Sequence, residues 1–387
     1  MNVEHTAIVV GAGIGGLAAA ISLRRIGWNV RVLERAASPR ELGFALALAP
    51  NALEALNELG LGEAVAREGA AVHTFDFRRA DGSILKRIDF RSAPPDARSI
   101  VTLRPALHGA LLAALPDPAL LLDHEVHHVT LTERGVTATL ADGRTLDAAV
   151  LIAADGVGSA VRRQLHPGEP PPARSGYHAL RGVTRDAAAA LEPVSAAIYL
   201  GDGIEAGFAR ANATDVYWYL SIVDELVPSG ASPADVLQCG MRGVDPRVTA
   251  IARAAAPGDL RLEPLYRREP ITQWGSGRAT LLGDAAHPVL PHTAQGAALA
   301  LEDAVALGLA LRRAADPAAA LRAYETVRAK RSRSVVRAGP RIAAVTTTRS
   351  RARIFARDTL IRLLPPALLS GTLRLHARDP HASLRAD

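Results

Sequence analysis

The sequence predicts an α/β fold in which a Rossmann-like nucleotide-binding domain carries an inserted β-sheet domain and is followed by C-terminal helices. Three stretches support this prediction: a glycine-rich strand–turn–helix at residues 6–34, strand-like segments at residues 175–219, and a second strand–turn–helix at residues 279–311. The chain has 387 residues, 49% of them hydrophobic, which is enough for two or three domains with cores of their own.

The first stretch has the pattern of one βαβ unit. Residues 7–10 are apolar, as in a buried parallel strand, and residues 17–26 have helical spacing that ends at Gly27. A second strand is expected at residues 30–33. A βαβ unit with a glycine-rich turn is typical of a dinucleotide site.

The glycines of this turn have the spacing G-x-G-x-x-G. We expect Gly11 to make the tight turn, Gly13 to let a pyrophosphate approach the backbone, and Gly16 to let the helix pack closely on the strand. The helix N-terminus adds amide donors and partial positive charge for the phosphates. Glu34 ends the second strand, where a carboxylate can accept both hydroxyls of an adenosine ribose.

The middle of the chain alternates short helices and strands. Arg104 opens one of the helices and is available for a phosphate, and Asp155 follows a strand that ends at the start of another helix. The expected elements are helices at 51–59, 102–115, 234–241 and 246–255, a hairpin at 72–90, strands at 136–140 and 145–152, a sheet at 175–219 and an extended segment at 260–269.

A second strand-to-helix junction follows at residues 279–296. Asp284 lies at its strand end, where it can accept hydrogen bonds from polyol hydroxyls. The backbone N–H groups near Gly296 are suited to an electron-rich ligand group. Because the adenosine end is already assigned to the first junction, a second one implies a cofactor longer than AMP. FAD fits, with its ribityl chain at Asp284 and its ring at Gly296, where the amides would stabilise the negative charge of the reduced ring.

These assignments divide the chain into interleaved domains. The expected ranges are 1–71, 99–174 and 271–330 for three parts of the FAD-binding domain, 72–98 for a substrate-domain hairpin, 175–270 for the substrate-domain sheet, and 331–387 for a basic C-terminal helical region.

Composition excludes several other classes. Cys239 is the one cysteine, so an internal disulfide is impossible, and no apolar run reaches about eighteen residues; we expect a cytoplasmic protein without a membrane span. The net charge is +6, yet residues 328–378 alone carry twelve Arg, one Lys and one Asp. Aromatic residues make up only 4% of the chain, so nucleic acid is not an expected partner. The basic end is instead a solvated helical face, or it attracts an anionic cosubstrate or a membrane surface.

A metal site is not expected. His124, His127 and His128 are close in sequence, but they lie on an expected strand, where successive side chains face opposite ways. No H-e-x-x-H or paired-Cys spacing accompanies them. Ser159 does not lie in a G-x-S-x-G turn, so a serine hydrolase is not expected either.

Three blocks together resemble the single-component (class A) FAD-dependent aromatic hydroxylases with the para-hydroxybenzoate hydroxylase fold. The blocks are GAGIGG at 11–16 with Glu34, AADGVGSAVR at 153–162, and GDAAHP with PHTAQGA at 283–297. Their order and spacing match over about the first 330 residues. The nearer similarity is to salicylate, 6-hydroxynicotinate and urate hydroxylases and to zeaxanthin epoxidase.

The resemblance implies roles for individual residues. The implied cofactor-binding set is Gly11, Gly13, Gly16, Glu34, Arg35, Arg104, Val126, Asp155, Asp284, Gly296 and Ala297. The expected cavity wall is Phe44, Ala47, Leu180, Phe208, Tyr217 and Pro291, and Tyr217 and His292 are the candidates for a catalytic proton relay. Two positions depart from the family: Ala47 replaces the histidine of the hydroxynicotinate enzymes, and Glu205 falls where urate hydroxylase has an arginine.

The activity implied by the resemblance is monooxygenation. NADH or NADPH would reduce FAD, O2 would form a flavin C4a-hydroperoxide, and one oxygen atom would pass to a small or medium aromatic or polyene substrate. The alternatives are another flavin oxidoreductase on the same scaffold, such as an epoxidase, a Baeyer–Villiger enzyme or a reductase, and a non-catalytic FAD-binding protein. Either a monomer or a homodimer is expected.

Overall fold

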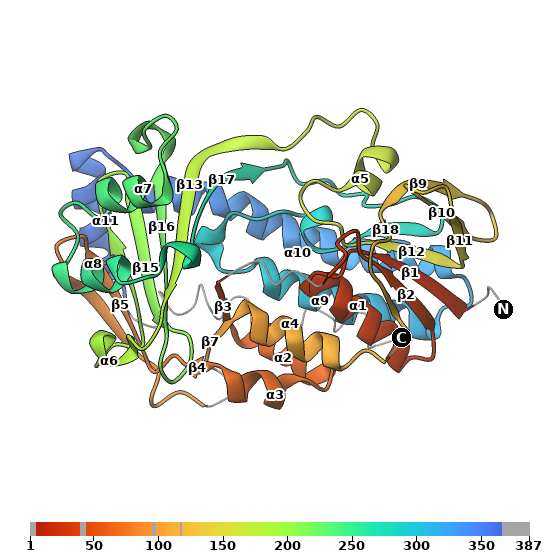
Figure 1. Ribbon diagram of the computed structural model, residues 1–387, viewed down its shortest axis with the longest axis horizontal. Helices are drawn as coiled ribbons and strands as arrows, with labels where there is room; N and C mark the ends of the chain where they lie inside the picture. The colour runs from red at the N-terminus through yellow and green to blue at the C-terminus, as the bar shows by residue number, and fades with distance from the viewer. Residues whose placement is uncertain (1–4, 39–43, 95–97, 117, 366–387) are drawn as a thin grey trace.

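Two large β-sheets lie toward opposite ends of an elongated molecule, and long helices run between them (Figure 1). The computed structural model describes residues 5–38, 44–94, 98–116 and 118–365. The expected α/β architecture, a Rossmann-like domain with a second sheet and C-terminal helices, is confirmed.

The first sheet is five-stranded and parallel. In spatial order its strands are β18 (Ala279–Leu281), β12 (Val150–Ala153), β1 (Thr6–Val10), β2 (Asn29–Leu33) and β8 (Leu120–Leu121). The strands are almost continuously apolar because helices cover the sheet, and β12 is buried at every position. Because all of the strands are parallel, their carboxyl ends lie along one edge.

Two helices pack against this sheet and against each other: α1 (Ile14–Arg25) and α9 (Gly296–Arg313). Small residues let them approach, since a Cβ added at Gly308 would lie 2.2 Å from Ser22 Oγ and one at Gly15 would lie 3.2 Å from Ala300 Cβ. The helix expected at 17–26 begins earlier, at Ile14 within the glycine-rich turn.

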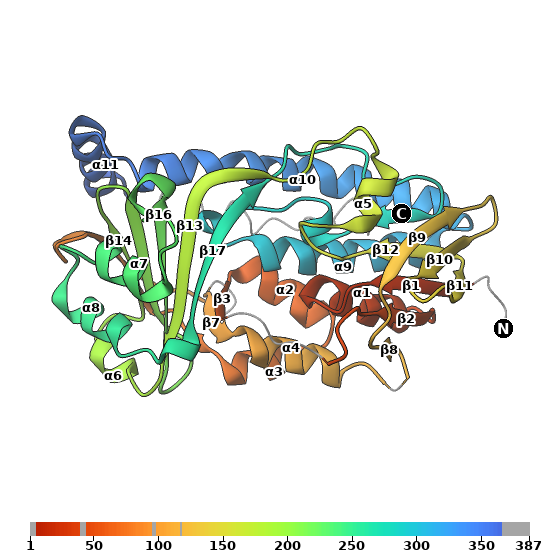
Figure 2. The same ribbon diagram turned by 45° about the horizontal axis from the view of Figure 1, so that its top comes forward.

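The second sheet is seven-stranded and mostly antiparallel. Its order is β17 (Leu260–Arg267), β13 (Ala173–Thr184), β16 (Val216–Val223), β15 (Ile204–Arg210), β14 (Ala196–Leu200), β5 (Thr74–Arg79) and β6 (Ile84–Asp89). Two helices, α7 (Pro233–Gly240) and α8 (Pro246–Arg253), cover one of its faces, as Figure 2 shows. The hairpin expected at 72–90 joins this sheet by parallel pairing of β5 with β14.

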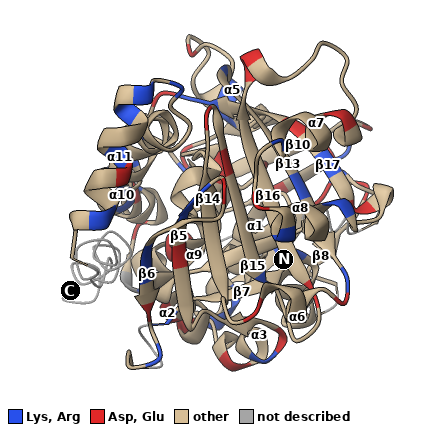
Figure 3. Cartoon of the chain, turned by 90° about the vertical axis from the view of Figure 1, so that its left-hand side faces the viewer, with Lys and Arg blue, Asp and Glu red and all other residues tan. Residues whose placement is uncertain are grey.

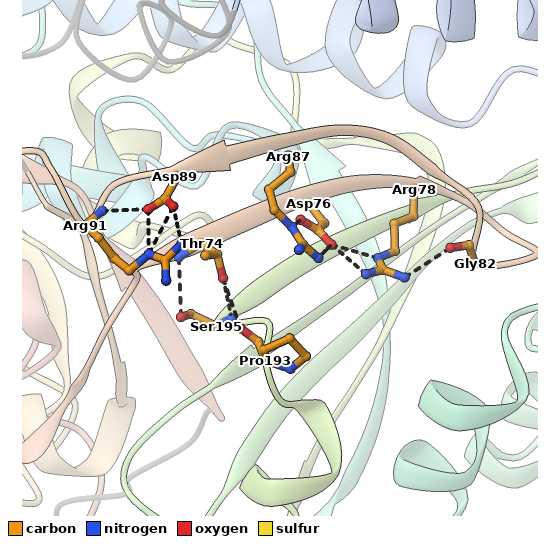
Figure 4. Close-up of polar contacts among 9 residues, drawn as sticks. All are labelled: Thr74, Asp76, Arg78, Gly82, Arg87, Asp89, Arg91, Pro193 and Ser195. Atoms are coloured by element: carbon orange, nitrogen blue, oxygen red, sulfur yellow. Dashed lines mark hydrogen bonds and ion pairs between the residues drawn. The ribbon is translucent and has the colours of Figure 1, made fainter.

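Polar contacts hold the two strands of the hairpin together and attach its base to the chain before β14 (Figure 4). The Asp76 carboxylate is fully buried and accepts hydrogen bonds from Arg78 and Arg87 at 2.6–3.0 Å. Burial alone would raise the carboxyl pKa, but these two guanidinium groups hold the pKa of Asp76 below its usual value. At the base of the hairpin, Thr74 and Ser195 exchange hydrogen bonds with each other's backbone.

Two small sheets complete the strands. One contains β11 (Thr145–Ala148), β10 (Val136–Leu140) and β9 (Val126–Leu131); the other contains β3 (Ala45–Leu48), β7 (Ile100–Leu103) and β4 (Ala70–Ala71). The expectation of a single strand at 145–152 was wrong. The chain leaves the antiparallel pairing of β11 at Ala149, whose N–H donates to Thr6 O, and enters the parallel sheet as β12.

Shorter helices connect these sheets: α2 (Pro50–Glu58), α3 (Gly62–Glu68), α4 (Arg104–Ala113), α5 (Ala160–Leu165) and α6 (Ala188–Leu191). The first two residues of the helix expected at 102–115 belong instead to the end of β7. The helices expected at 51–59, 234–241 and 246–255 match α2, α7 and α8 to within two residues at each end.

The basic C-terminal region forms two helices. α10 (Pro317–Thr346) runs along the molecule from the parallel sheet toward the seven-stranded sheet and continues through the domain boundary expected at residue 330 (Figure 2). α11 (Arg351–Leu363) packs on β6 (Figure 3). Arg79, at the end of the neighbouring β5, donates to the buried Asp358 carboxylate at 2.6 Å. The remainder of this region, residues 366–387, lies outside the described residues.

Several arginines of the basic region point inward rather than into solvent. Arg328 is fully buried, Arg331 is paired with Glu302, and Arg357 is buried beside Asp358. Arg337, Arg341, Arg351 and Arg353 are exposed, so only part of the basic region forms the expected solvated face. None of the helices within the described ranges has the length and apolarity that crossing a bilayer would need.

Candidate active site

Three strand-to-helix junctions that are far apart in sequence meet at one edge of the parallel sheet. They follow β1, β12 and β18, which are neighbours in the sheet. A Cβ added at Gly11 would lie 2.6 Å from Ala154 O, and Leu282 N donates to Ala153 O at 2.9 Å. The carboxyl edge of a parallel sheet is where ligands bind in doubly wound folds. The turns at Gly11, Asp155 and Asp284 thus lie side by side along this edge.

The glycine-rich turn has the geometry that a pyrophosphate needs. Gly11 has φ +100°, a conformation that favours glycine, and a Cβ at Gly16 would lie 1.9 Å from Gly11 O. A Cβ at Gly13 would have no neighbour within 4 Å, and no side chain caps α1 there. The first amides of α1 are therefore accessible to an anion. Phosphate binding by these residues stays a prediction.

Glu34 is held in place by backbone donors. Ala12 N donates to Oε2 and Ala36 N donates to Oε1, each at 2.9 Å. A carboxylate oxygen can accept more than one hydrogen bond, so each of these two oxygens retains capacity for a ribose hydroxyl. The adjacent Arg35 is exposed. His108, which sequence reasoning missed, fixes the same turn because its Nε2 lies 2.7 Å from Ala12 O.

Asp155 caps α5 with one of its two oxygens. Oδ2 accepts from Ala160 N at 2.8 Å, whereas Oδ1 is buried without a hydrogen-bond partner among the described residues. A buried carboxylate oxygen with spare acceptor capacity suits a ligand hydroxyl at this edge.

Asp284 and Arg104 lie close enough for their charges to interact. Both side chains are reached by solvent, yet protein surrounds them closely. Burial raises the pKa of the Asp284 carboxyl, and the nearby Arg104 charge partly opposes that shift. Burial likewise lowers the pKa of Arg104. A solvent-accessible pair of opposite charges at the end of β18 suits a polar ligand group there.

The entrance to α9 is built by buried polar side chains that sequence reasoning missed. Asn51 Nδ2 donates to Gln295 Oε1 at 3.1 Å and to Glu302 Oε1 at 2.6 Å. Gly296 and Ala297 follow, half-buried, at a helix N-terminus that no side chain caps. Their amides are available to an electron-rich ring edge, as expected for the flavin; this role stays a prediction.

A second cluster of buried side chains, centred on Asp303, is hydrogen-bonded to the Asp284 turn. Asp303 Oδ2 accepts from Gly283 N at 3.0 Å and lies 2.5 Å from His287 Nε2, while Oδ1 accepts from Arg328 Nε at 2.7 Å. Burial would raise the pKa of Asp303, but the His287 and Arg328 charges hold it well below its usual value. Through Asp303, His287 is therefore joined to the backbone of this turn.

The seven-stranded sheet supplies the opposite wall, and strand alternation decides which side chains face it. Tyr217, Tyr219 and Ser221 point from β16 toward the nucleotide-binding domain, where Tyr217 packs near Ala45 and Val101. The expectation that Leu180 and Phe208 line the cavity was wrong. Both lie on the other face, in the core with α7 and α8.

His292 bridges the two domains. Its Nε2 lies 2.8 Å from Ser221 Oγ, and its ring packs edge-on against Tyr177 at 5.5 Å between centroids. Burial lowers the pKa of His292, with the Glu205 charge partly opposing, and so favours the neutral ring. Burial also raises the pKa of Tyr217. Both catalytic candidates therefore lie at this wall, uncharged at neutral pH.

The other expected residues have less direct placements. Phe44 O accepts from Arg104 N at 3.2 Å, Ala47 is exposed on β3, and Pro291 is half-buried in the turn that carries His292. Val126 is buried in the core at the start of β9, so only its backbone is available to a cofactor. Within the described part of the chain, no group of three or more His, Cys, Asp or Glu side chains is arranged to hold a metal ion.

A Rossmann-like domain with two uncapped helix entrances at one sheet edge, facing a tyrosine-bearing sheet across the cleft, defines a two-domain flavoprotein. The chain belongs to the FAD binding domain family, which its sequence matches over residues 4–339. The glycine turn, the spare oxygen of Asp155 and the enclosed Asp284 all fit FAD, and FAD is the cofactor of this family.

Relatives define the group more closely. The chain is 31% identical to Aurachin C monooxygenase/isomerase of Stigmatella aurantiaca, over 94% of this chain and 95% of that one. It is 32% identical to 6-hydroxynicotinate 3-monooxygenase of Bordetella bronchiseptica, over 85% and 89% respectively. A crystal structure of Klebsiella pneumoniae HpxO complexed with FAD and uric acid superposes with a TM-score of 0.89, at 26% identity, over 97% of this chain and 99% of that one. The resemblance to class A hydroxylases is confirmed: the chain is an FAD-dependent monooxygenase.

Proposed function

We propose that this protein uses NADH or NADPH and O2 to hydroxylate a small or medium-sized aromatic or polyene compound. The observation that carries the proposal is the convergence of the Gly11, Asp155 and Asp284 turns opposite Tyr217 and His292. The relatives named above act on aromatic compounds, which supports an aromatic substrate here.

The residues at the cleft edge would hold the cofactor. Gly11, Gly13 and Gly16 would take the pyrophosphate, Glu34 the ribose, and the α9 entrance the ring edge. The chemistry that bound flavin supplies is hydride acceptance from the nicotinamide, activation of dioxygen, and delivery of one oxygen atom to the substrate. Asp303 would keep the Asp284 turn rigid, because its hydrogen bonds fix Gly283 and His287.

His292 and Tyr217 would handle protons at the substrate wall. A neutral His292 can accept a proton from a substrate hydroxyl, and Ser221 Oγ at 2.8 Å holds its ring in position. The tyrosines would contribute to excluding water, so that reducing equivalents pass to the substrate rather than to free peroxide.

Substrate-dependent oxygen incorporation tests the proposal. FAD-loaded protein is supplied with NADH or NADPH and a panel of phenols and heteroaromatic compounds, and 18O from 18O2 is followed into the product by mass spectrometry. Stimulated nicotinamide oxidation with one 18O atom in the product supports hydroxylation. Substrate reduction without O2 would indicate a reductase, and FAD-bound protein inert to both nicotinamides would indicate a non-catalytic role.

For its setting, we propose a cytoplasmic monomer or homodimer without a nucleic-acid partner. The internal pairing of Arg328, Arg331 and Arg357 leaves less of the basic region available to phosphates. Light scattering of the purified protein gives the oligomeric state, and a DNA retardation assay at 0.15 M salt, about physiological ionic strength, tests the absence of nucleic-acid binding.

A further inference from the structure

Glu205 is a buried carboxylate without a cation. Its residue is only 3% exposed, and Tyr219 Oη, at 2.6 Å from Oε1, is its one hydrogen-bond donor among the described residues. The other buried carboxylates in the described part of the chain each pair with at least one arginine. These are Asp76, Asp215, Glu302, Asp303, Glu325 and Asp358.

Strand register places Glu205 at the substrate wall. It lies directly opposite Ser221, whose hydroxyl contacts His292 of the nucleotide-binding domain. Glycine at 207 makes the arrangement possible, because the Tyr219 ring covers that position and a Cβ there would lie 2.0 Å from Tyr219 Cε1. Tyr219 thereby reaches Oε1 and leaves Oε2 without a donor from the described residues.

A buried carboxylate with a spare oxygen favours one class of ligand. An uncompensated negative charge in a low-dielectric site repels anions and is stabilised by a hydrogen-bond donor or a positive charge. The same site would penalise a ligand that brings a second carboxylate, as two like charges would then share one cavity.

We propose that Glu205 is the specificity-determining residue of the substrate site, selecting neutral or cationic aromatic compounds with an N–H or O–H donor and rejecting aromatic carboxylates. The inference deepens the proposed function and rests on it for the location of the substrate. It sets this chain apart from its relative named for 6-hydroxynicotinate, which is a carboxylate.

Three ligands that differ in one group test the proposal: 3-hydroxybenzoate, 3-hydroxybenzamide and 3-hydroxybenzamidine. Each is titrated into the FAD-loaded full chain at pH 7.5, and binding is read from the change in flavin absorbance without turnover. We expect the amide and the amidine to bind about 10-fold or more tightly than the benzoate, because hydrogen bonds to a charged acceptor are strong.

The variant Glu205→Gln keeps an acceptor for Tyr219 and removes the charge. It should weaken amidine binding about 10-fold and tighten benzoate binding. Glu225→Gln removes the same charge from an exposed position after β16 and should change neither affinity. If the glutamine variant at 205 does not retain FAD, the affinity order of the wild type alone decides.

Three results would overturn the proposal: benzoate binding as tightly as the amide in the wild type, an unchanged affinity order in Glu205→Gln, or no binding by any of the three ligands. Failure of the proposed function is seen separately. In that case the ligands bind in the expected order, but no compound stimulates nicotinamide oxidation.

Discussion

Arg328 on α10 donates from Nε to Oδ1 of Asp303 on α9 at 2.7 Å, and both side chains are fully buried. Through Asp303 this pair reaches Gly283 and His287, so the long C-terminal helix supports the second cofactor turn. The position of the cleft therefore depends on a helix that contributes no expected cofactor ligand.

Removing the charge of Asp303 should destabilise the fold. Asp303→Asn leaves the Arg328 charge undercompensated in the core, and breaking a buried pair costs about 3–5 kcal/mol. Urea denaturation measures the free energy of unfolding, and the FAD content of the purified protein should fall as well. Asp89→Asn, which breaks an exposed pair with Arg91, is the control and should leave both readouts unchanged. Equal unfolding curves for the wild type and Asp303→Asn would refute this role.

Neutralising Glu34 should weaken FAD but not FMN. Glu34→Gln keeps the shape of the side chain but removes the charge that would hold the ribose hydroxyls, together with one of the two acceptors for the Ala12 and Ala36 amides. Hydrogen bonds to a charged group are worth about 1.5–3 kcal/mol, so we expect FAD affinity to fall at least about 10-fold. Quenching of flavin fluorescence on titration into apoprotein gives both dissociation constants. FMN, which lacks the adenosine, is the internal control, and a parallel loss for both flavins would point to a damaged glycine turn.

His292 should make the fold sensitive to acid. Burial lowers its pKa below the ordinary 6.5, so the unfolded chain binds a proton more readily than the folded one. The stabilising effect of a neutral His292 is complete above pH 6.5 and declines as the pH falls below that value. His292→Gln should thus lose less stability than the wild type between pH 7.5 and about pH 5. Identical losses in the two proteins, measured by urea denaturation at both pH values, would contradict this.

Ala294 should prefer replacement by glycine. It has φ +50° in the turn before α9, a left-handed conformation that costs a residue with a Cβ about 1–2 kcal/mol. Ala294→Gly should retain or increase stability, whereas the β-branched Ala294→Val should lower it and reduce FAD content. Thermal unfolding of the two variants provides the comparison, and a valine variant as stable as the glycine variant would show that the turn relaxes.

Local patterns in the sequence were sufficient for the parts of the fold that short segments specify. The β1–α1–β2 unit, the hairpin around Asp81-Gly82 and the strand end at Asp284 were predicted because hydrophobic periodicity and turn residues act over a few positions.

Other predictions failed where the outcome depends on contacts with residues outside the segment. Leu180 and Phe208 were expected at the cavity, but the helices α7 and α8 cover the face of the sheet on which both lie. The break at Ala149 depends on pairing with Thr6, far away in the chain. The networks around Asn51 and Asp303 join partners more than 15 residues apart, and no local pattern marks them.

The sequence by itself determined the cofactor class, because a glycine turn, a helix entrance and an acid at a strand end are each local and chemically specific. Only the tertiary structure decided what faces that cofactor. The register of two neighbouring strands, β15 and β16, brings Glu205, Tyr219 and Ser221 to one wall. The burial of Glu205 without a cation, on which its proposed role depends, is not visible in the sequence. Burial and charge pairing are properties of the whole packed chain, and they arise only when distant segments meet.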